Sequence, residues 1–277
     1  MARPKSGYKN AAGLPVPGTG DINGRYMNRE RLLYWAFNRG KQGLPKLYDN
    51  SALDIGTAVH TMAELDLRGD PEKEILYYLE ATLTYAEDRE KAAASFKTFR
   101  AWRSQFHVDA YKQEISLVSE KLQFGGTLDT VAFIRSGKGL LEFKTSSEVY
   151  EDHLLQMAAY GILWAENNPT EPLDAGYHLI LLPKDGSKPV HREFTHEQLH
   201  PFRQKFWLYR QAYNYEAPCN DPKVLAGSKV APSPKPKGRV VPVQMAIPDC
   251  RLDPPAVQLS MGELLRSYGH IKEGVGA

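Results

Sequence analysis

The spacing of apolar residues changes along this chain, and the change separates helical from extended regions. After residue 51 apolar side chains recur at intervals of three and four, as in Ile55, Ala58, Val59 and Met62. This spacing places them on one face of an α-helix. We therefore predict a helix over about 51–68 and a long helical stretch over about 71–106, preceded by a first helix over 28–38.

From residue 114 the apolar period shortens to about two, which is typical of strands. We predict strands at 114–119, 124–134, 139–145, 176–182 and 190–194, with a turn at 135–138. Helical spacing returns at 151–166 and at 196–213. This order predicts an α/β fold in which helices flank one mixed central β-sheet.

Glycine and proline divide the chain into three regions. Residues 1–27 are rich in both and are expected to be irregular, and residues 28–216 carry the periodic pattern of one domain. Residues 217–277 form a basic segment, which holds nine of the 19 prolines between Pro218 and Pro255. Because proline interrupts helices and central strands, this segment is either a flexible linker or an arm that touches phosphates.

Composition narrows the classes of protein that fit. The net charge of +2 is nearly neutral, so nucleic-acid affinity would have to come from local clusters of Lys and Arg. Two cysteines, Cys219 and Cys250, are too few for a four-cysteine zinc or iron–sulfur site. No apolar run approaches the ~18 residues of a membrane span, and no secretory signal is present. We expect a cytoplasmic protein without a membrane partner.

Three charged residues on the second and third predicted strands are the first candidates for chemistry. Alternation puts Glu142 and Lys144 on one face of their strand and Phe143 on the other. A turn centred near 136–137 places Asp129 opposite Lys144. Two carboxylates this close favour a hard divalent cation, and a nearby lysine can hold a water. The alternative is a cross-strand salt bridge on a solvated face.

Two helical motifs flank these strands. Gly56, His60 and Glu64 follow one another at steps of four and share a helix face, where His60 could bind a metal and Glu64 orient it. Gln156 and Tyr160 are also four residues apart and could contact a phosphate. The alternatives are a structural histidine and a hydrogen bond on the helix surface.

Together these motifs resemble, in order and spacing, the RecB-type branch of the PD-(D/E)XK nuclease superfamily. That branch has G-x-x-x-H-x-x-x-E on a helix, a Glu on a strand, then G-x-x-D, E/D-x-K and Q-x-x-x-Y. The corresponding residues here are Gly56, His60, Glu64, Glu114, Gly126, Asp129, Glu142, Lys144, Gln156 and Tyr160. The chain departs from the pattern at Leu128, which replaces the proline of the superfamily name.

The resemblance implies a restriction-endonuclease-like core and a role for each matching residue. Asp129, Glu142, the carbonyl of Phe143 and His60 would bind Mg²⁺ or Mn²⁺. Glu114 would bind a second metal or position a water, and Lys144 would position or activate the attacking water. The substrate would be contacted by Gln156, Tyr160, Thr145 and Gly56.

The function implied is metal-dependent hydrolysis of DNA, by an exonuclease of replication, recombination or repair. The chain is most similar to single-domain phage exonucleases and to mitochondrial genome maintenance exonucleases; a phage protein would act in the host cytoplasm. A recombination or single-strand-binding protein is a further expected partner. There are two alternatives. The chain could be a structure- or sequence-specific endonuclease, or it could be an inactive DNA-binding recombination partner.

Overall fold

A computed structural model describes residues 4, 7–27, 30–41, 51–135 and 137–219 of the protein. The helices are α1 (Thr19–Tyr26), α2 (Glu30–Lys41), α3 (Ser51–Arg68), α4 (Glu72–Thr82), α5 (Ala86–Arg103), α6 (Glu151–Asn167), α7 (His200–Asn214) and α8 (Glu216–Cys219). The strands are β1 (Tyr8–Lys9), β2 (Pro15–Val16), β3 (Val108–Ser119), β4 (Phe124–Ile134), β5 (Gly137–Lys144), β6 (Gly176–Leu181) and β7 (Val190–Phe194).

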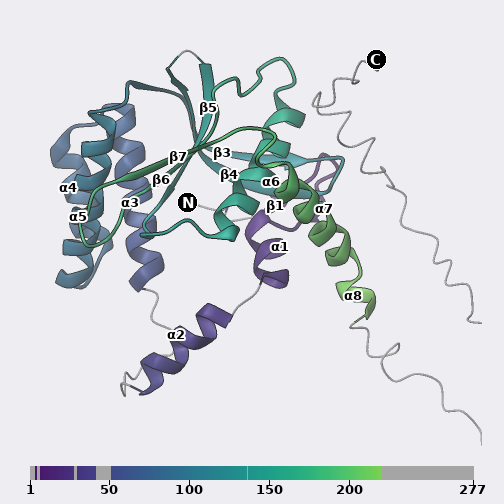
Figure 1. Ribbon diagram of the computed structural model, residues 1–277, viewed down its shortest axis with the longest axis horizontal. Helices are drawn as coiled ribbons and strands as arrows, with labels where there is room; N and C mark the ends of the chain where they lie inside the picture. The colour runs from purple at the N-terminus through teal and green to yellow at the C-terminus, as the bar shows by residue number, and fades with distance from the viewer. Residues whose placement is uncertain (1–3, 5–6, 28–29, 42–50, 136, 220–277) are drawn as a thin grey trace, which may run out of the picture.

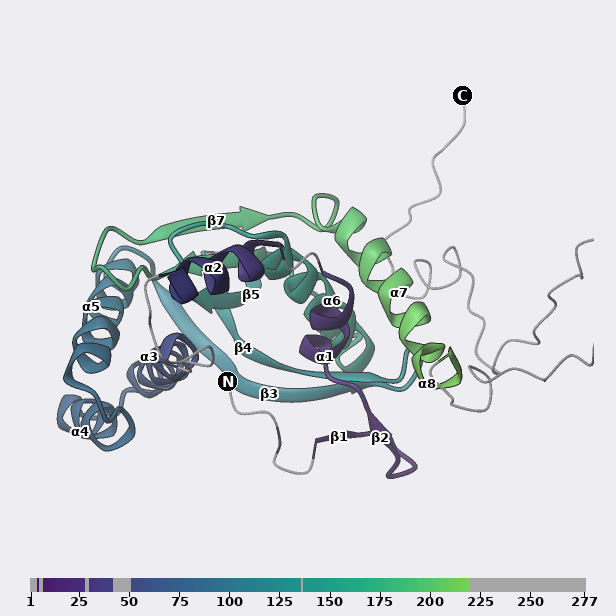
Figure 2. The ribbon, with the colours of Figure 1, turned by 90° about the horizontal axis from the view of Figure 1, so that it is seen from below.

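The main sheet has the strand order β3-β4-β5-β6-β7 and is mixed. Every neighbouring pair is antiparallel except β5 and β6, which are parallel and joined through α6. Helices α3, α4 and α5 lie on one side of the sheet, and α1, α6 and α7 on the other (Figures 1 and 2). This arrangement confirms the predicted α/β fold with a mixed sheet between helices.

Each face of the sheet supports its own apolar core. Leu140 packs with residues of α6 and α7, whereas Leu141 and Phe143 pack with residues of α3 and α5. Strand β6 is buried along its whole length, because helices cover both of its faces. The alternation along β5 thus sends Phe143 into one core, as the sequence predicted.

Residues 7–27 contain regular elements, although the composition of residues 1–27 led us to expect an irregular segment. Within it, β1 and β2 pair as a small hairpin and α1 packs on the sheet. Glycine makes this docking feasible: a Cβ at Gly125 would lie 2.3 Å from Cγ of Tyr8. The hydroxyl of Thr19 donates to the carbonyl of Gly125 at 3.1 Å, and Ile22 is fully buried. Packing against β4 orders a segment whose composition alone indicates a loop.

At the other end of the domain, the single turn of α8 ends at Cys219. The expectations for the proline-rich segment and its basic arm fall on residues 220–277, outside the described part of the chain. Among the described helices, none is both long and apolar enough to cross a membrane.

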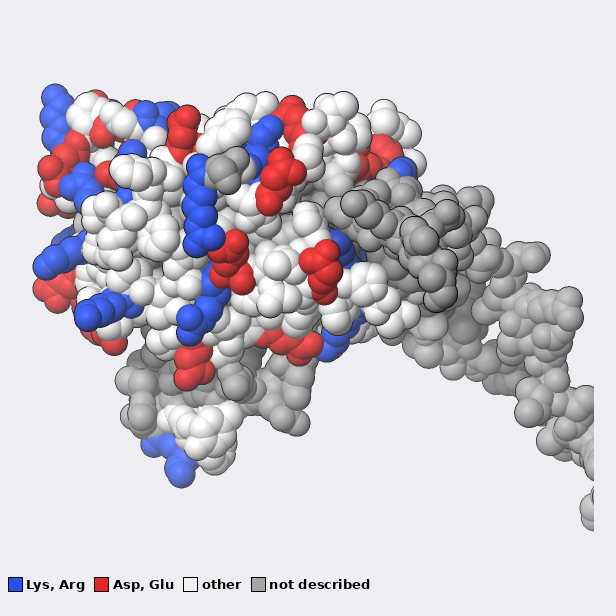
Figure 3. Space-filling model, turned by 45° about the horizontal axis from the view of Figure 1, so that its top comes forward, with Lys and Arg blue, Asp and Glu red and all other residues white. Residues whose placement is uncertain are grey.

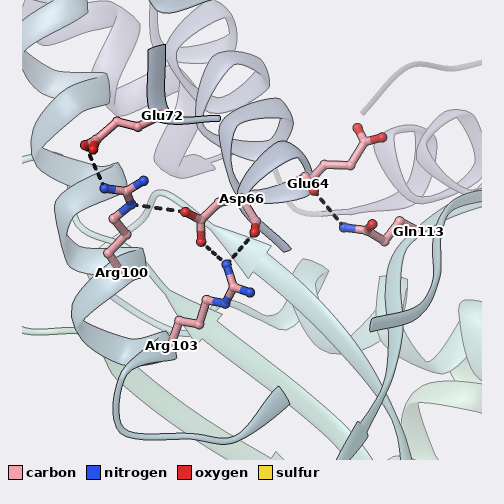
Figure 4. A network of polar contacts seen from close by, with 6 residues as sticks. All are labelled: Glu64, Asp66, Glu72, Arg100, Arg103 and Gln113. Carbon is pink, nitrogen blue, oxygen red and sulfur yellow. Dashed lines mark hydrogen bonds and ion pairs between the residues drawn. The ribbon is translucent and has the colours of Figure 1, made fainter. Parts of the chain in front are cut away.

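Two arginines of α5 have a structural role. Arg100 and Arg103 both form ion pairs with Asp66 of α3 (Figure 4). Arg100 also pairs with Glu72 at 2.8 Å. These contacts join the helices on this side of the sheet. Acidic and basic side chains are interspersed across the face in Figure 3, in agreement with the nearly neutral charge.

A chain of ring nitrogens joins α5 to β6 and β7. Trp102 donates from Nε1 to Nδ1 of His191 at 3.3 Å, and Nε2 of His191 lies 3.0 Å from Nδ1 of buried His178. Burial lowers the pKa of both histidines, and that of His191 falls to about 4. A protonated His191 could not accept from Trp102.

We expect this chain of rings to make folding sensitive to acid. Between pH 6.5 and about 4 the unfolded chain binds protons that the folded protein excludes, so the free energy of unfolding falls as pH falls. His191→Asn keeps an acceptor for Trp102 without the titrating ring. Urea unfolding at pH 7 and pH 5 should therefore show a smaller loss of stability in His191→Asn than in the wild type. Equal losses in the two proteins would contradict this prediction.

Candidate active site

Three carboxylates occupy neighbouring positions on three adjacent strands. Glu114 and Asp129 lie opposite each other, between the pairs Gln113–Thr130 and Ile115–Leu128 of β3 and β4. The last pair of β4 with β5 is Thr130–Leu141, so Asp129 and Glu142 follow as the next position. The sequence placed Asp129 opposite Lys144 instead. That register is wrong because the hairpin turn is only two residues long, between Ile134 and Gly137.

Helix α3 adds a histidine to this row. Nδ1 of His60 lies 3.2 Å from Oδ2 of Asp129, and both side chains are almost wholly buried. Ligand atoms of His60, Glu114 and Asp129 all lie within 4.8 Å of one another. One nitrogen and two carboxylate oxygens at this spacing can surround a single divalent cation.

The backbone at Glu114 is strained. Its φ is +47°, in the left-handed region, although the residue is not a glycine and lies within a strand. Such a conformation costs about 1–2 kcal/mol and is concentrated at functional sites. Here the strained backbone carries the carboxylate that faces His60 and Asp129.

In each of two buried carboxylates, one oxygen accepts a hydrogen bond and the other has no hydrogen-bond partner among the described residues. Oδ2 of Asp129 accepts from the backbone N–H of Phe143 at 2.9 Å, and Oε1 of Glu142 accepts from Nζ of Lys144 at 2.6 Å. Oδ1 of Asp129 and Oε2 of Glu142 are buried without a hydrogen-bond partner among the described residues. Buried polar atoms are rarely left in this way unless a ligand or ion completes them. The donor set therefore fits a hard divalent cation.

The ionisable groups influence one another strongly. Burial and the Asp129 carboxylate raise the pKa of Glu142 to about 8. Burial alone would also raise the pKa of Asp129. The charges of His60 and Lys144 outweigh burial and hold the pKa of Asp129 below its usual value. Burial would lower the pKa of Lys144, yet Glu142 and Asp129 raise it. This excess of buried negative charge is what a bound cation would neutralise.

The residues predicted to bind substrate lie on α3, directly after β5, and on α6. Gly56 of α3 faces Thr145, since a Cβ there would lie 3.7 Å from the threonine hydroxyl. On α6, Nε2 of Gln156 donates to the hydroxyl of Tyr160 at 2.7 Å, and both residues line a cavity of about 190 Å³. Glu64, expected to orient His60, has its carboxylate 3.5 Å from Arg68.

Sequence reasoning missed two parts of this neighbourhood. Tyr8 and Thr19 line the same cavity, although they come from the segment expected to be irregular. His153 of α6 is buried, and burial, together with the charge of Lys144, lowers its pKa to about 4. The glycine pair Gly125-Gly126 was the available signal for Tyr8 and Thr19, because it indicates close approach by another segment.

The sequence model of the PD-(D/E)XK nuclease superfamily matches residues 33–221, more than half of the chain. The protein belongs to this superfamily. The residues matched include all five strands of the main sheet and the three carboxylates. No protein of curated function matches the sequence.

Among solved structures, the nuclease is similar to a candidate exonuclease from Eubacterium rectale, with a TM-score of 0.39 and 10% sequence identity. The similarity covers 73% of this chain and 76% of the other. Superfamily membership makes the chain a nuclease, and among the described residues His60, Glu114 and Asp129 form a group that could hold a metal ion.

Proposed function

We propose that this chain is a divalent-metal-dependent deoxyribonuclease that acts from DNA ends, in replication, recombination or repair. The observation that carries the proposal is the row of Glu114, Asp129 and Glu142 beside His60, in which one buried oxygen each of Asp129 and Glu142 has no hydrogen-bond partner among the described residues. Superfamily membership supports phosphodiester hydrolysis, and the donor set supports Mg²⁺ or Mn²⁺.

The metal would be held by Asp129, Glu142, His60 and the carbonyl of Phe143, with Glu114 as a further carboxylate. A divalent cation bound there would neutralise the carboxylates and polarise the scissile phosphate. The backbone N–H of Phe143 donates to one oxygen of Asp129, and the other oxygen, which has no hydrogen-bond partner among the described residues, would be available to an ion. These contacts hold the ligands in place before the metal binds.

Lys144 is the residue that we assign to the attacking water. Its ammonium group is anchored on Glu142 at 2.6 Å and is only 15% exposed. From that position it can donate to a water and offset the charge that grows on the phosphate. Gln156, Tyr160, Thr145 and Gly56 border the same region and would contact the DNA backbone.

Action from ends is tested by comparing linear with covalently closed circular DNA of the same sequence. We expect degradation of linear single- or double-stranded DNA in Mg²⁺ or Mn²⁺, with circular DNA left intact, because an exonuclease requires an end. Excess chelator should stop the reaction and added metal restore it. Equal cutting of circles would make the protein an endonuclease. Metal-independent DNA binding without cleavage of either substrate would make it an inactive DNA-binding protein.

A further inference from the structure

The cavity beside the carboxylates is built largely by the N-terminal segment. It has a volume of about 190 Å³ and is open on one side. Its wall comes from β1, the start of α1, β4 and α6, through Tyr8, Gly18, Thr19, Gly20, Asp21, Gly126, Thr127, Gln156 and Tyr160. Aromatic rings and glycine backbone make up much of this wall, with a few hydroxyl, amide and carboxylate groups among them.

Hydrogen bonds fix the wall to the strand that carries Asp129. The hydroxyls of Tyr8 and Thr127 lie 3.0 Å apart, and Thr127 also lies 2.9 Å from the hydroxyl of Ser116. The backbone N–H of Gly18 donates to Asp21 at 2.9 Å, which closes the first turn of α1. The cavity is therefore a defined feature of the fold.

The cavity also adjoins the carboxylates. Thr127 precedes Asp129 by two residues on β4, a separation of about 7 Å along a strand. Tyr160 links the two places, since it lines the cavity and its ring packs against Gly126 of β4, three residues before Asp129. A phosphate at the carboxylates would therefore have its nucleoside within reach of the cavity.

We propose that this cavity receives the sugar and base of the nucleotide at the end of the DNA strand, while the scissile phosphate lies at the carboxylates. The proposal rests on the proposed nuclease function and adds to it a specific binding site. Tyr8 and Tyr160 offer aromatic surface, and Gln156, Thr127 and Asp21 offer hydrogen-bonding groups. Tyr8, Gly18 and Thr19 lie against Gly125 of β4 at this wall of the cavity, and this packed segment favours one nucleotide at an end over a continuous strand.

Competition in the wild-type protein tests this site without any substitution. A deoxynucleoside 5′-monophosphate should inhibit cleavage of linear DNA at least about tenfold more strongly than inorganic phosphate at the same metal concentration. Equal inhibition by the two would overturn the proposal, since it would show that the nucleoside adds no binding. A wild-type protein that cleaves no DNA with either metal would reject the nuclease function itself, which is a distinguishable outcome.

Filling the cavity gives an independent test. A Cβ at Gly20 would meet no atom within 4 Å, so Gly20→Leu adds bulk at the cavity wall from a position where a side chain has room to begin. We expect its KM for linear DNA and its inhibition constant for the deoxynucleoside monophosphate to rise about tenfold. Gly20→Ala should show a smaller rise in both. The matched control Ala81→Leu adds the same side chain at an exposed position of α4 and should stay within about twofold of wild type.

Thermal melting followed by circular dichroism verifies that the variants fold. A folded Gly20→Leu with the same KM and inhibition constant as Ala81→Leu would overturn the proposal. The competition assay decides the question if Gly20→Leu does not fold.

Discussion

Replacing Lys144 with methionine is expected to lower the rate of DNA cleavage about a thousandfold. Methionine has a similar length but no charge, so it can neither hold a water nor offset charge on the phosphate. The measurement is single-turnover cleavage of end-labelled linear DNA with saturating Mg²⁺ or Mn²⁺. Lys144→Ala should lose activity to a similar extent.

The fold should survive this substitution. Lys144 is the partner of fully buried Glu142, and an unpaired buried carboxylate is costly. The pKa of Glu142 is already raised to about 8 by burial and Asp129, so a proton can take the place of the ammonium group at neutral pH. DNA binding in the presence of chelator, followed by fluorescence anisotropy, should also persist.

Lys138→Met is the matched control for Lys144. It removes a lysine from the same strand, where Lys138 pairs with Glu171 at 2.7 Å, away from the carboxylates. We expect nearly wild-type cleavage from this control. Full activity in Lys144→Met, or an equal loss in both variants, would contradict the role assigned to Lys144.

Asp129→Asn is expected to abolish both cleavage and the stabilisation of the protein by divalent metal. The amide can still accept from the N–H of Phe143, so the hairpin is preserved, but it binds a hard cation far more weakly. Without several kcal/mol of metal stabilisation in the transition state, the rate should fall about a thousandfold or more.

Thermal melting separates metal binding from chemistry. For the wild type, Mn²⁺ at about 100 times its Kd should add ~2.7 kcal/mol to the free energy of unfolding. Chelator should reverse this gain, and Asp129→Asn should not show it. Asp109→Asn, which changes an exposed carboxylate of β3, is the matched control and should respond to Mn²⁺ like the wild type. The same gain in Asp129→Asn would contradict the proposed ligand set.

Much of the fold followed from local patterns. The five strands of the sheet and helix α6 were predicted within a few residues, except that β3 begins six residues earlier than expected. The relative orientation of Glu142, Phe143 and Lys144 was also predictable, because side-chain alternation depends only on the strand itself. The strand pairing was less predictable: an error of one residue in the centre of the β4–β5 hairpin moved the expected partner of Asp129 by two residues, from Glu142 to Lys144.

The sequence by itself thus determined which residues are the candidates for the chemistry, since motif spacing and periodicity are properties of neighbouring residues. Only the tertiary structure decided which other side chains those residues contact. It placed Glu114 and His60 beside Asp129, engaged Arg100 and Arg103 with Asp66, and docked Tyr8 against Gly125. These contacts join residues far apart in the chain, and their stability comes from burial and from satisfied polar groups in the assembled core. Periodicity carries no information about such pairings, so the site became visible only when the strands and helices were packed together.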